Sequence, residues 1–328
     1  MISEVLKNIA IDVKDIANTA FDYKGTQDVP NDSDPGLSYE GGMTKWGKEI
    51  TTCVLYVDIR NSVSLTARHQ TKTMGKLYTA FAKGVIKAAR EFNGHTRNII
   101  GDRVMIVFPV KNCFTNAVSC AIAINNVAGI IAAQFPSVEF KCGIGIDHGQ
   151  MRVIKVGVPR RGQESKPNKG LVWAGKPANL ASRLTDMGNK TVTKVYYDIE
   201  RIPFNPKATK PLGYDAMGLL QKSFSGYDPN APFYLPNDRI TLTEANFLSS
   251  FHMSNGLALT TGGKIVSVKK RTVTHKYETI LITERVYQGL TQEGASNLNK
   301  AGWWKIDANT IRDIDCPVRS GSYVWSVK

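Results

Sequence analysis

Residues 53–62, CVLYVDIRNS, and residues 98–108, NIIGDRVMIVF, each place one aspartate in a short apolar run. Both runs are rich in β-branched residues and are typical of strands. A carboxylate among such neighbours is costly to bury unless a partner offsets its charge. Asp58 and Asp102 on adjacent strands could share divalent cations, which stabilise the attacking and leaving oxygens in phosphoryl transfer. The pair therefore indicates a metal-dependent enzyme that acts on a nucleotide.

The chain has 328 residues, enough for one large domain or two ordinary ones, and a formal net charge of +14. This charge is compatible with a solvated basic surface, with attraction of a phosphate-rich substrate or with nucleic acid. The basic residues are dispersed and form no aromatic–basic repeat, so we expect no nucleic-acid partner. The five cysteines include no CxxC pair, which is typical of buried thiols in a reducing cytoplasm.

The first 20 residues carry apolar side chains at helical spacing, which predicts an amphipathic helix that packs on the protein or on a second copy. They lack the basic start and long apolar stretch of a signal peptide. The most apolar segment, residues 117–133, is interrupted by Asn125, Asn126 and Gly129, and a buried helix explains it better than a membrane span. We therefore expect a cytoplasmic protein with no membrane partner.

Around the two aspartates, segments with strand and helix patterns follow one another. Helices are predicted at residues 72–92, 115–134 and 176–187. Strands are predicted after a turn at Asn93-Gly94, at 139–147, at 152–157 after a turn at 148–150, and at 171–174. This order indicates an α+β fold of the ferredoxin-like kind, an antiparallel sheet flanked by helices.

Three stretches in this order resemble the class III nucleotidyl cyclases, namely VLYVDIRNSVSLT (54–66), NIIGDRVMIVF (98–108) and WAGKPANLASRL (173–184). The resemblance implies the class III cyclase fold and two Mg²⁺ or Mn²⁺ ions, bound by Asp58, Asp102 and the backbone carbonyl of Ile59. It also implies that Asn179 orients the ribose and that Arg183 stabilises charge on the phosphates. These last two residues are four apart and share one helix face.

The same resemblance implies a head-to-tail homodimer with two composite sites, each of which converts a nucleoside triphosphate to a cyclic nucleotide and pyrophosphate. The loop after the first aspartate is expected to cradle the phosphates with backbone N–H groups. The residues of this loop are Arg60, Asn61, Ser62, Val63 and Ser64. The family often has a late lysine that binds phosphate, and Arg319 is the nearest equivalent here.

Neither purine-reading pair of the family is present, because Asn98 and Val172 stand at its two positions. Tyr56 and Arg97 are also expected near the base. The bulk of Tyr56 would shrink the pocket, while Arg97 and Asn98 could donate hydrogen bonds to the carbonyl oxygens of a pyrimidine. The arrangement resembles the pyrimidine cyclases of bacterial Pycsar anti-phage signalling, in which a separate effector responds to the cyclic product.

UTP is therefore the favoured substrate, and a cytidylate or adenylate cyclase is the alternative within the same chemistry. A catalytically silent nucleotide sensor is the alternative from another class. Such a sensor should lack a metal-binding aspartate or the arginine, whereas this chain retains Asp58, Asp102 and Arg183.

Residues 1–43 are expected to form a helical arm and loop, and residues 44–328 the cyclase domain. Two late segments, ETILITERVY (278–287) and DIDCPVRSGSYVW (313–325), resemble the family's strand-then-helix segment and its closing hairpin. Residues 187–277 would then be an insertion, and the alternative is a separate C-terminal sensor domain from about residue 215. The insertion is favoured because the late segments complete the cyclase sheet.

Overall fold

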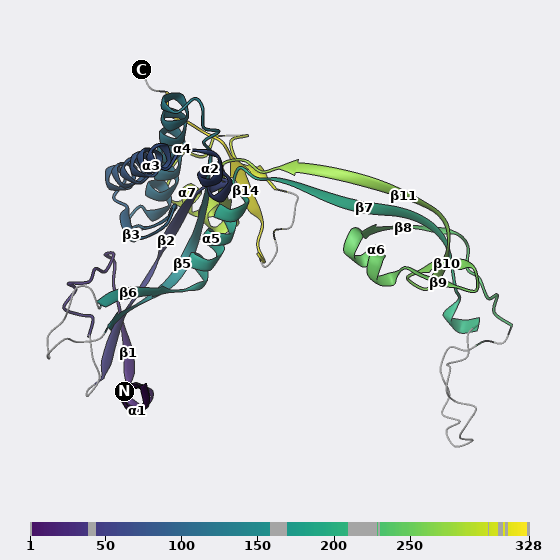
Figure 1. The fold of residues 1–328 in the computed structure, drawn as a ribbon, viewed down its shortest axis with the longest axis horizontal. Coiled ribbons are helices and arrows are strands. Elements are labelled where there is room, and N and C mark those ends of the chain that lie inside the picture. Colours follow the sequence, from purple (N-terminus) through teal and green to yellow (C-terminus); the bar gives the residue numbers. More distant parts are fainter. Residues whose placement is uncertain are drawn as a thin grey trace. The chain divides into compact units, whose positions relative to one another are not determined.

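The computed structural model describes residues 2–38, 44–157, 169–208, 228, 230–300, 302–307, 311 and 314–326. The chain divides into two compact units, the first formed by Met1–Lys190 with Tyr277–Lys328 and the second by Thr191–Lys276. Each unit has a sheet of its own (Figure 1). The second unit therefore interrupts the sequence of the first and lies within the range predicted for the insertion.

Among the described residues, the first unit has a nine-stranded sheet in the order β13-β14-β12-β5-β2-β4-β3, with β1 paired to β2 and β6 to β5. Only the β1–β2 and β12–β5 pairs within it are parallel. Its strands are β1 (Phe21–Gly25), β2 (Lys45–Ile59), β3 (His95–Ile100), β4 (Arg103–Val107), β5 (Cys142–Gly157), β6 (Lys169–Ala174), β12 (Ile280–Thr283), β13 (Lys305–Ile306) and β14 (Val318–Gly321).

Helices pack on both faces of this sheet. The helices of this unit are α1 (Ile2–Asn18), α2 (Ser62–Arg68), α3 (Thr71–Glu91), α4 (Cys113–Gln134), α5 (Lys176–Met187) and α7 (Glu284–Gln292), and all but α1 contribute buried residues to its cores. The larger apolar core joins α3, α4 and α7 to one face, through side chains such as Leu55 and Val57 of β2. The smaller core joins α5 to the other face, where Val54 of β2 and Met105 of β4 meet Ala181. Because successive side chains of β2 point to opposite faces of the sheet, the strand contributes to both cores.

The helix α4 is apolar around most of its circumference because it lies inside the larger core. Among the described helices, it alone is long and apolar enough to cross a membrane, and 50% of its apolar window is buried in the protein. All residues of α1, by contrast, are exposed, including the apolar residues that gave the predicted amphipathic pattern.

The predicted α+β fold, an antiparallel sheet flanked by helices, is confirmed. The helices predicted at 72–92, 115–134 and 176–187 correspond to α3, α4 and α5, with ends that differ by at most two residues. The late segment 278–287 contains β12 followed by α7, as its pattern predicted. In the predicted closing segment, β14 is present, but its hairpin partner is β13, which lies earlier in the chain.

The predicted turn at residues 148–150 is wrong, because β5 runs without interruption from Cys142 to Gly157. The long strand β2 pairs with it from the Lys48–Val153 pair to the Ile59–Cys142 pair. Gly149 has a different role from that of a turn residue. A Cβ atom there would lie 2.9 Å from the Pro177 ring, so glycine lets the first turn of α5 approach the strand.

The second unit contains a five-stranded antiparallel sheet in its described part, in the order β8-β7-β11-β10-β9. Its elements are β7 (Thr191–Pro203), the 3₁₀ turn Pro206–Ala208, β8 (Asp238–Thr243), α6 (Glu244–Ser250), β9 (His252–Ser254), β10 (Leu257–Thr260) and β11 (Gly263–Lys276). Most of β11 is exposed, as expected for a ribbon of two long strands with little core.

Candidate active site

The helix α5 lies directly on the sheet because β5 presents glycine at two positions beneath it. A Cβ atom on Gly145 would lie 2.2 Å from the carbonyl oxygen of Ala181, and one on Gly143 would lie 2.6 Å from that of Thr185. Contacts under 3.0 Å are not seen for real Cβ atoms, so any larger residue would push the helix away. The hydroxyl of Thr185 also donates a hydrogen bond to the Tyr56 carbonyl oxygen on β2, at 3.0 Å.

The two predicted metal-binding aspartates lie beneath the C-terminal half of α5. Asp58 is the penultimate residue of β2. Its side chain points to the α5 face because side chains alternate along a strand, and Val54 and Tyr56 lie on that face. Asp102 lies in the two-residue turn between β3 and β4, after Gly101, whose φ of +62° suits glycine. Since β4 pairs with β2, this turn places Asp102 near the end of β2 that carries Asp58.

Arg103 links this pair to α5, although its side chain was not among the predicted site residues. Its guanidinium donates two hydrogen bonds to Asp58 Oδ2, at 2.7 and 3.2 Å. It also donates to Ser182 Oγ at 2.8 Å and to the Asp186 carboxylate. The sequence signal was present, because alternation along β4 places Arg103 on the same face as Met105 and opposite Asp58.

Each aspartate keeps one buried oxygen without a hydrogen-bond partner, Oδ1 of Asp58 and Oδ2 of Asp102. Burial raises the pKa of the Asp58 carboxyl above its usual range, and the nearby Asp102 charge adds to the rise, while Arg103 opposes it. Two converging acceptors of this kind fit a hard divalent cation, which prefers carboxylate oxygens. The described residues hold no cluster of three or more His, Cys, Asp or Glu side chains, so further ligands would be main-chain oxygens, such as that of Ile59, or substrate and water.

The predicted phosphate loop follows Asp58 and turns sharply into α2. Asn61 adopts a left-handed conformation with φ of 55°, and Ser62, Val63 and Ser64 form the first turn of the helix. Arg60 is directed elsewhere, because its guanidinium donates to the carbonyl oxygens of Thr185 and Asp186 at 2.8 and 2.9 Å. Arg60 therefore anchors the last turn of α5 above the aspartates, and its role as a phosphate ligand stays a prediction.

The two predicted catalytic residues of α5 are both exposed. Asn179 and Arg183 lie one turn apart on the helix, and Arg183 directly follows Ser182, which Arg103 contacts. The helix begins at Lys176 with Pro177 in its first turn, where proline is well tolerated, and its buried side is formed by small and aliphatic residues. Two polar side chains are thus presented on a helix that is fixed to the sheet by close backbone packing.

The predicted base-binding residues lie farther along the same face of the sheet. In the strand register, Tyr56 of β2 is paired with Met105 of β4, which is paired with Asn98 of β3. Arg97 sits in a break of register between Thr96 and Asn98, and such bulges redirect side chains.

The Arg97 guanidinium lies 6.0 Å from the ring of Trp173, and its Nε is buried without a hydrogen-bond partner. Val172, the neighbour of Trp173 on β6, is 44% exposed. Trp173 was missed because only position 172 of β6 was compared with the family's base-reading positions. The structure therefore adds an aromatic ring beside the predicted donor.

Arg319 lies outside this group. Its guanidinium donates to both carboxylate oxygens of Glu284, at 2.7 and 3.1 Å, and stands 3.7 Å from the Tyr287 ring centre. Its strand, β14, is separated from β2 by β12 and β5. Within one chain, the side chain of Arg319 is largely buried and held by α7, and its phosphate contact stays a prediction.

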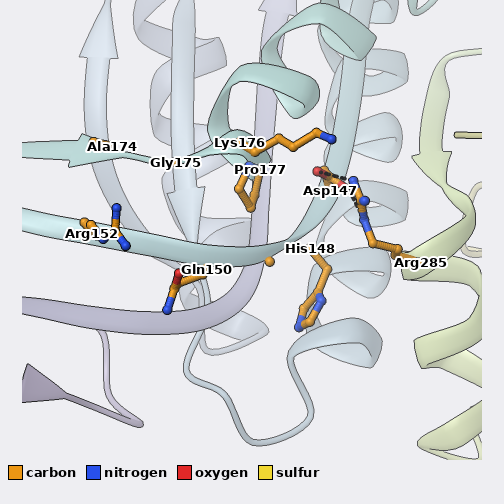
Figure 2. Close-up of a pocket in the computed structure, with 10 residues that line it drawn as sticks. Asp147, His148, Gln150, Arg152, Ala174, Gly175, Lys176, Pro177 and Arg285 are labelled. Carbon is orange, nitrogen blue, oxygen red and sulfur yellow. Dashed lines mark hydrogen bonds and ion pairs between the residues drawn. The ribbon is translucent and has the colours of Figure 1, made fainter. Parts of the chain in front are cut away.

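A cavity of about 470 Å³ opens beside the N-terminus of α5 (Figure 2). Its wall includes the ion pair between Arg285 and the fully buried Asp147, at 3.1 Å, together with Arg152 and Lys176. Asp147 also accepts a 2.6 Å hydrogen bond from the Thr283 hydroxyl, so its charge is compensated. None of the predicted site residues lines this cavity, which shows that the aspartate pair and the cavity are different features of the α5 face.

The chain is similar to several known proteins. The curated uridylate cyclase of Burkholderia cepacia is 29% identical over 185 residues, which cover 55% of this chain and 76% of the relative. The resemblance to nucleotidyl cyclases seen in the sequence is confirmed by this relative. No family model matches the chain.

Two solved structures from Pseudomonas aeruginosa are also similar. The adenylyl cyclase CyaB has a TM-score of 0.46 and 14% identity, covering 83% of this chain and 93% of that chain. A class III adenylyl cyclase-like ATP-binding protein has a TM-score of 0.45 and 15% identity, covering 58% of this chain and 41% of that chain.

Proposed function

We propose that this protein is a metal-dependent nucleotidyl cyclase that converts UTP to 3′,5′-cyclic UMP and pyrophosphate. The observation that carries the proposal is the pair of buried carboxylate oxygens without a hydrogen-bond partner, one on Asp58 and one on the neighbouring Asp102. The uridylate cyclase among the relatives supports both the reaction class and the base.

The reaction forms a bond from the ribose 3′ oxygen to the α-phosphorus and breaks the bond from that phosphorus to the bridging oxygen of pyrophosphate. Mg²⁺ or Mn²⁺ held by the two carboxylates would make the 3′-hydroxyl more acidic and neutralise charge on the triphosphate. Asp58 and Asp102 would bind and position the cations, together with the main-chain oxygen of Ile59. Arg183 offsets negative charge that develops on the phosphates, and Asn179 orients the ribose. The proton of the 3′-hydroxyl passes to solvent.

We further propose that the working unit is a head-to-tail homodimer in which the aspartates of one copy meet Asn179 and Arg183 of the other. Both α5 residues are exposed in the single chain, as residues that contact a second copy should be. Mixing two inactive variants tests this directly. Asp58→Asn and Arg183→Ala each destroy both sites of their own dimer, whereas a mixed dimer has one intact site. Random exchange should restore about a quarter of the native activity.

The preference for uracil rests on Arg97 and Asn98, which lie near Tyr56 on the α5 face. Two donors suit the two carbonyl oxygens of uracil, whereas cytosine would need an acceptor for its amino group. The Arg97 Nε is buried and has no hydrogen-bond partner in the chain, so a base carbonyl that reached it would satisfy this donor. A cytidylate or adenylate cyclase is the alternative that the substrate assay distinguishes.

The deciding experiment incubates the purified chain with Mn²⁺ and each of ATP, GTP, CTP and UTP, and detects cyclic products by mass. Asp58→Asn is the matched control, since it keeps the side-chain volume and removes the charge. Cyclic UMP from the native chain alone supports the proposal. Cyclic AMP or cyclic CMP would contradict the base assignment, and no product from any nucleotide would favour the silent sensor.

The biological role that we propose is that of a second-messenger synthase in anti-phage defence, whose cyclic product is bound by a separate effector. This role rests on the resemblance to pyrimidine cyclases of that system. Expression of the native chain together with an effector that binds cyclic UMP should protect a bacterial host from phage, and Asp58→Asn should abolish the protection. Equal protection by the variant would contradict a role for the cyclic product.

A further inference from the structure

Arg103 occupies the place next to the two aspartates that a cation is expected to take. Its guanidinium contacts Asp58 Oδ2 twice, at 2.7 and 3.2 Å, and its side chain is 29% exposed while that of Asp58 is 16% exposed. The contact is charge-assisted, and two N–H groups of the guanidinium donate to the single oxygen Oδ2. Asp58 therefore has a protein cation on one oxygen and a free acceptor on the other.

A divalent cation and this guanidinium cannot both bind Asp58 at full strength. Each is positive, and the carboxylate is half-buried, where repulsion between neighbouring charges is less screened than in water. A cation that binds Asp58 together with Asp102 must therefore weaken or replace the Arg103 contact. Arg60, the other nearby arginine, lies 4.0 Å from Asp58 and is held by carbonyl oxygens of α5, so it does not compete in the same way.

Arg103 already has other acceptors to which it can retreat. Ser182 Oγ accepts from its Nη1 at 2.8 Å, and the Asp186 carboxylate accepts from its Nη2. Both acceptors lie in the last two turns of α5, where the helix dipole also favours a cation. Asp186 is 53% exposed, so a guanidinium paired with it stays hydrated and is not left as a buried, unpaired charge.

We infer that Arg103 is a positioning residue that competes with the divalent cation for Asp58, and that cation binding transfers its guanidinium from Asp58 wholly to Asp186 and Ser182, which it already contacts. The inference rests on the proposed function, because it takes the aspartate pair as the cation site. Arg103 keeps Asp58 compensated before the cation arrives, and afterwards its charge is held by α5, the helix that carries Asn179 and Arg183. Cation binding is thereby coupled to the position of α5.

The first test measures Mn²⁺ affinity without nucleotide, by the electron paramagnetic resonance signal of free Mn²⁺. Arg103→Gln should bind Mn²⁺ about tenfold more tightly than the native chain, because a charge-assisted pair no longer has to be broken. Arg201→Gln is the matched control, since Arg201 also donates two hydrogen bonds to one carboxylate, that of Asp238 in the second unit. Its Mn²⁺ affinity should equal that of the native chain. Unchanged or weaker binding by Arg103→Gln would overturn the inference.

The second test observes the guanidinium itself in the native chain, and it does not depend on the folding of any variant. The ¹⁵N–¹H signal of Arg103 Nε should shift when Mg²⁺ is added, because Nε leaves Asp58. The Nε signal of Arg201 should stay in place. Tighter Mn²⁺ binding by Arg103→Gln with an unmoved Arg103 signal would mean simple charge repulsion, and would overturn the transfer.

These outcomes separate the inference from the proposed function. If Asp58→Asn abolishes Mn²⁺ binding but the native chain makes no cyclic product, the cyclase proposal fails while the role of Arg103 is still decided by the two tests. If Asp58→Asn binds Mn²⁺ as the native chain does, the aspartate pair is not the cation site, and the inference about Arg103 is overturned.

Discussion

Replacing Gly145 with alanine should damage the site through packing alone, without touching any polar residue. The added Cβ would lie 2.2 Å from the Ala181 carbonyl oxygen, 2.5 Å from the Thr185 nitrogen and 2.7 Å from Leu184 Cβ. Two of these atoms belong to the α5 backbone, which cannot turn aside as a flexible side chain can. Ordinary contact begins at 3.4 Å, so the helix must move by about 1 Å.

The size of the effect follows from this displacement. Overpacking of a tight core costs about 1–3 kcal/mol. For a unit of this size, each kcal/mol lowers Tm by about 2–4 °C. Because α5 carries Asn179 and Arg183, a shift of ~1 Å should also lower the cyclase rate by roughly 100-fold.

Thermal unfolding followed by circular dichroism and the cyclization assay measure the two effects. Gly129→Ala is the matched control, because Gly129 lies on the exposed side of α4 and a Cβ there would meet nothing within 4 Å. This control should keep full activity and gain about 0.5–1 kcal/mol of stability, since glycine disfavours helix interiors. If Gly145→Ala has the Tm and activity of the native chain, the close packing of α5 on β5 does not exist as described.

Three further predictions concern single side chains. Asp102→Asn should abolish cyclase turnover and leave the far-ultraviolet circular dichroism spectrum unchanged, and residual native-like turnover would contradict its role as a cation ligand. Thr283→Val removes the 2.6 Å hydrogen bond to the buried Asp147 and should lower the free energy of unfolding by about 1–3 kcal/mol in urea titrations. Arg97→Met should lower kcat/KM for UTP by about tenfold, through loss of a hydrogen bond from a charged donor, and an unchanged kcat/KM would place the base elsewhere.

Some features were readable from local sequence because they depend on neighbours a few residues away. The apolar run before Asp58, the Gly-Asp turn at Asp102 and the helical spacing of α5 each express the geometry of one strand, one turn or one helix. The same holds for residues 278–287, where a strand of four buried residues passes directly into a helix. Order along the chain then indicated which elements could share a sheet.

Other features depended on which distant segment lies alongside. Gly149 suggested a turn because glycine permits one, yet the length of β2 and the approach of Pro177 keep β5 extended there. Gly145 gave no signal of its own, since its small size matters only where the α5 backbone passes. In both cases the role of the glycine is set by its tertiary neighbours and not by the residues next to it in the sequence.

The sequence by itself determined the α+β fold, the pair Asp58 and Asp102 and the helix that bears Asn179 and Arg183. The tertiary structure decided what surrounds the pair. Arg103 follows Asp102 directly, but its long side chain reaches Asp58 on one strand and Asp186 on a helix. A long, charged side chain such as that of Arg103 donates to whichever acceptors the folded chain brings within its reach. Those acceptors come from segments that no local sequence pattern connects.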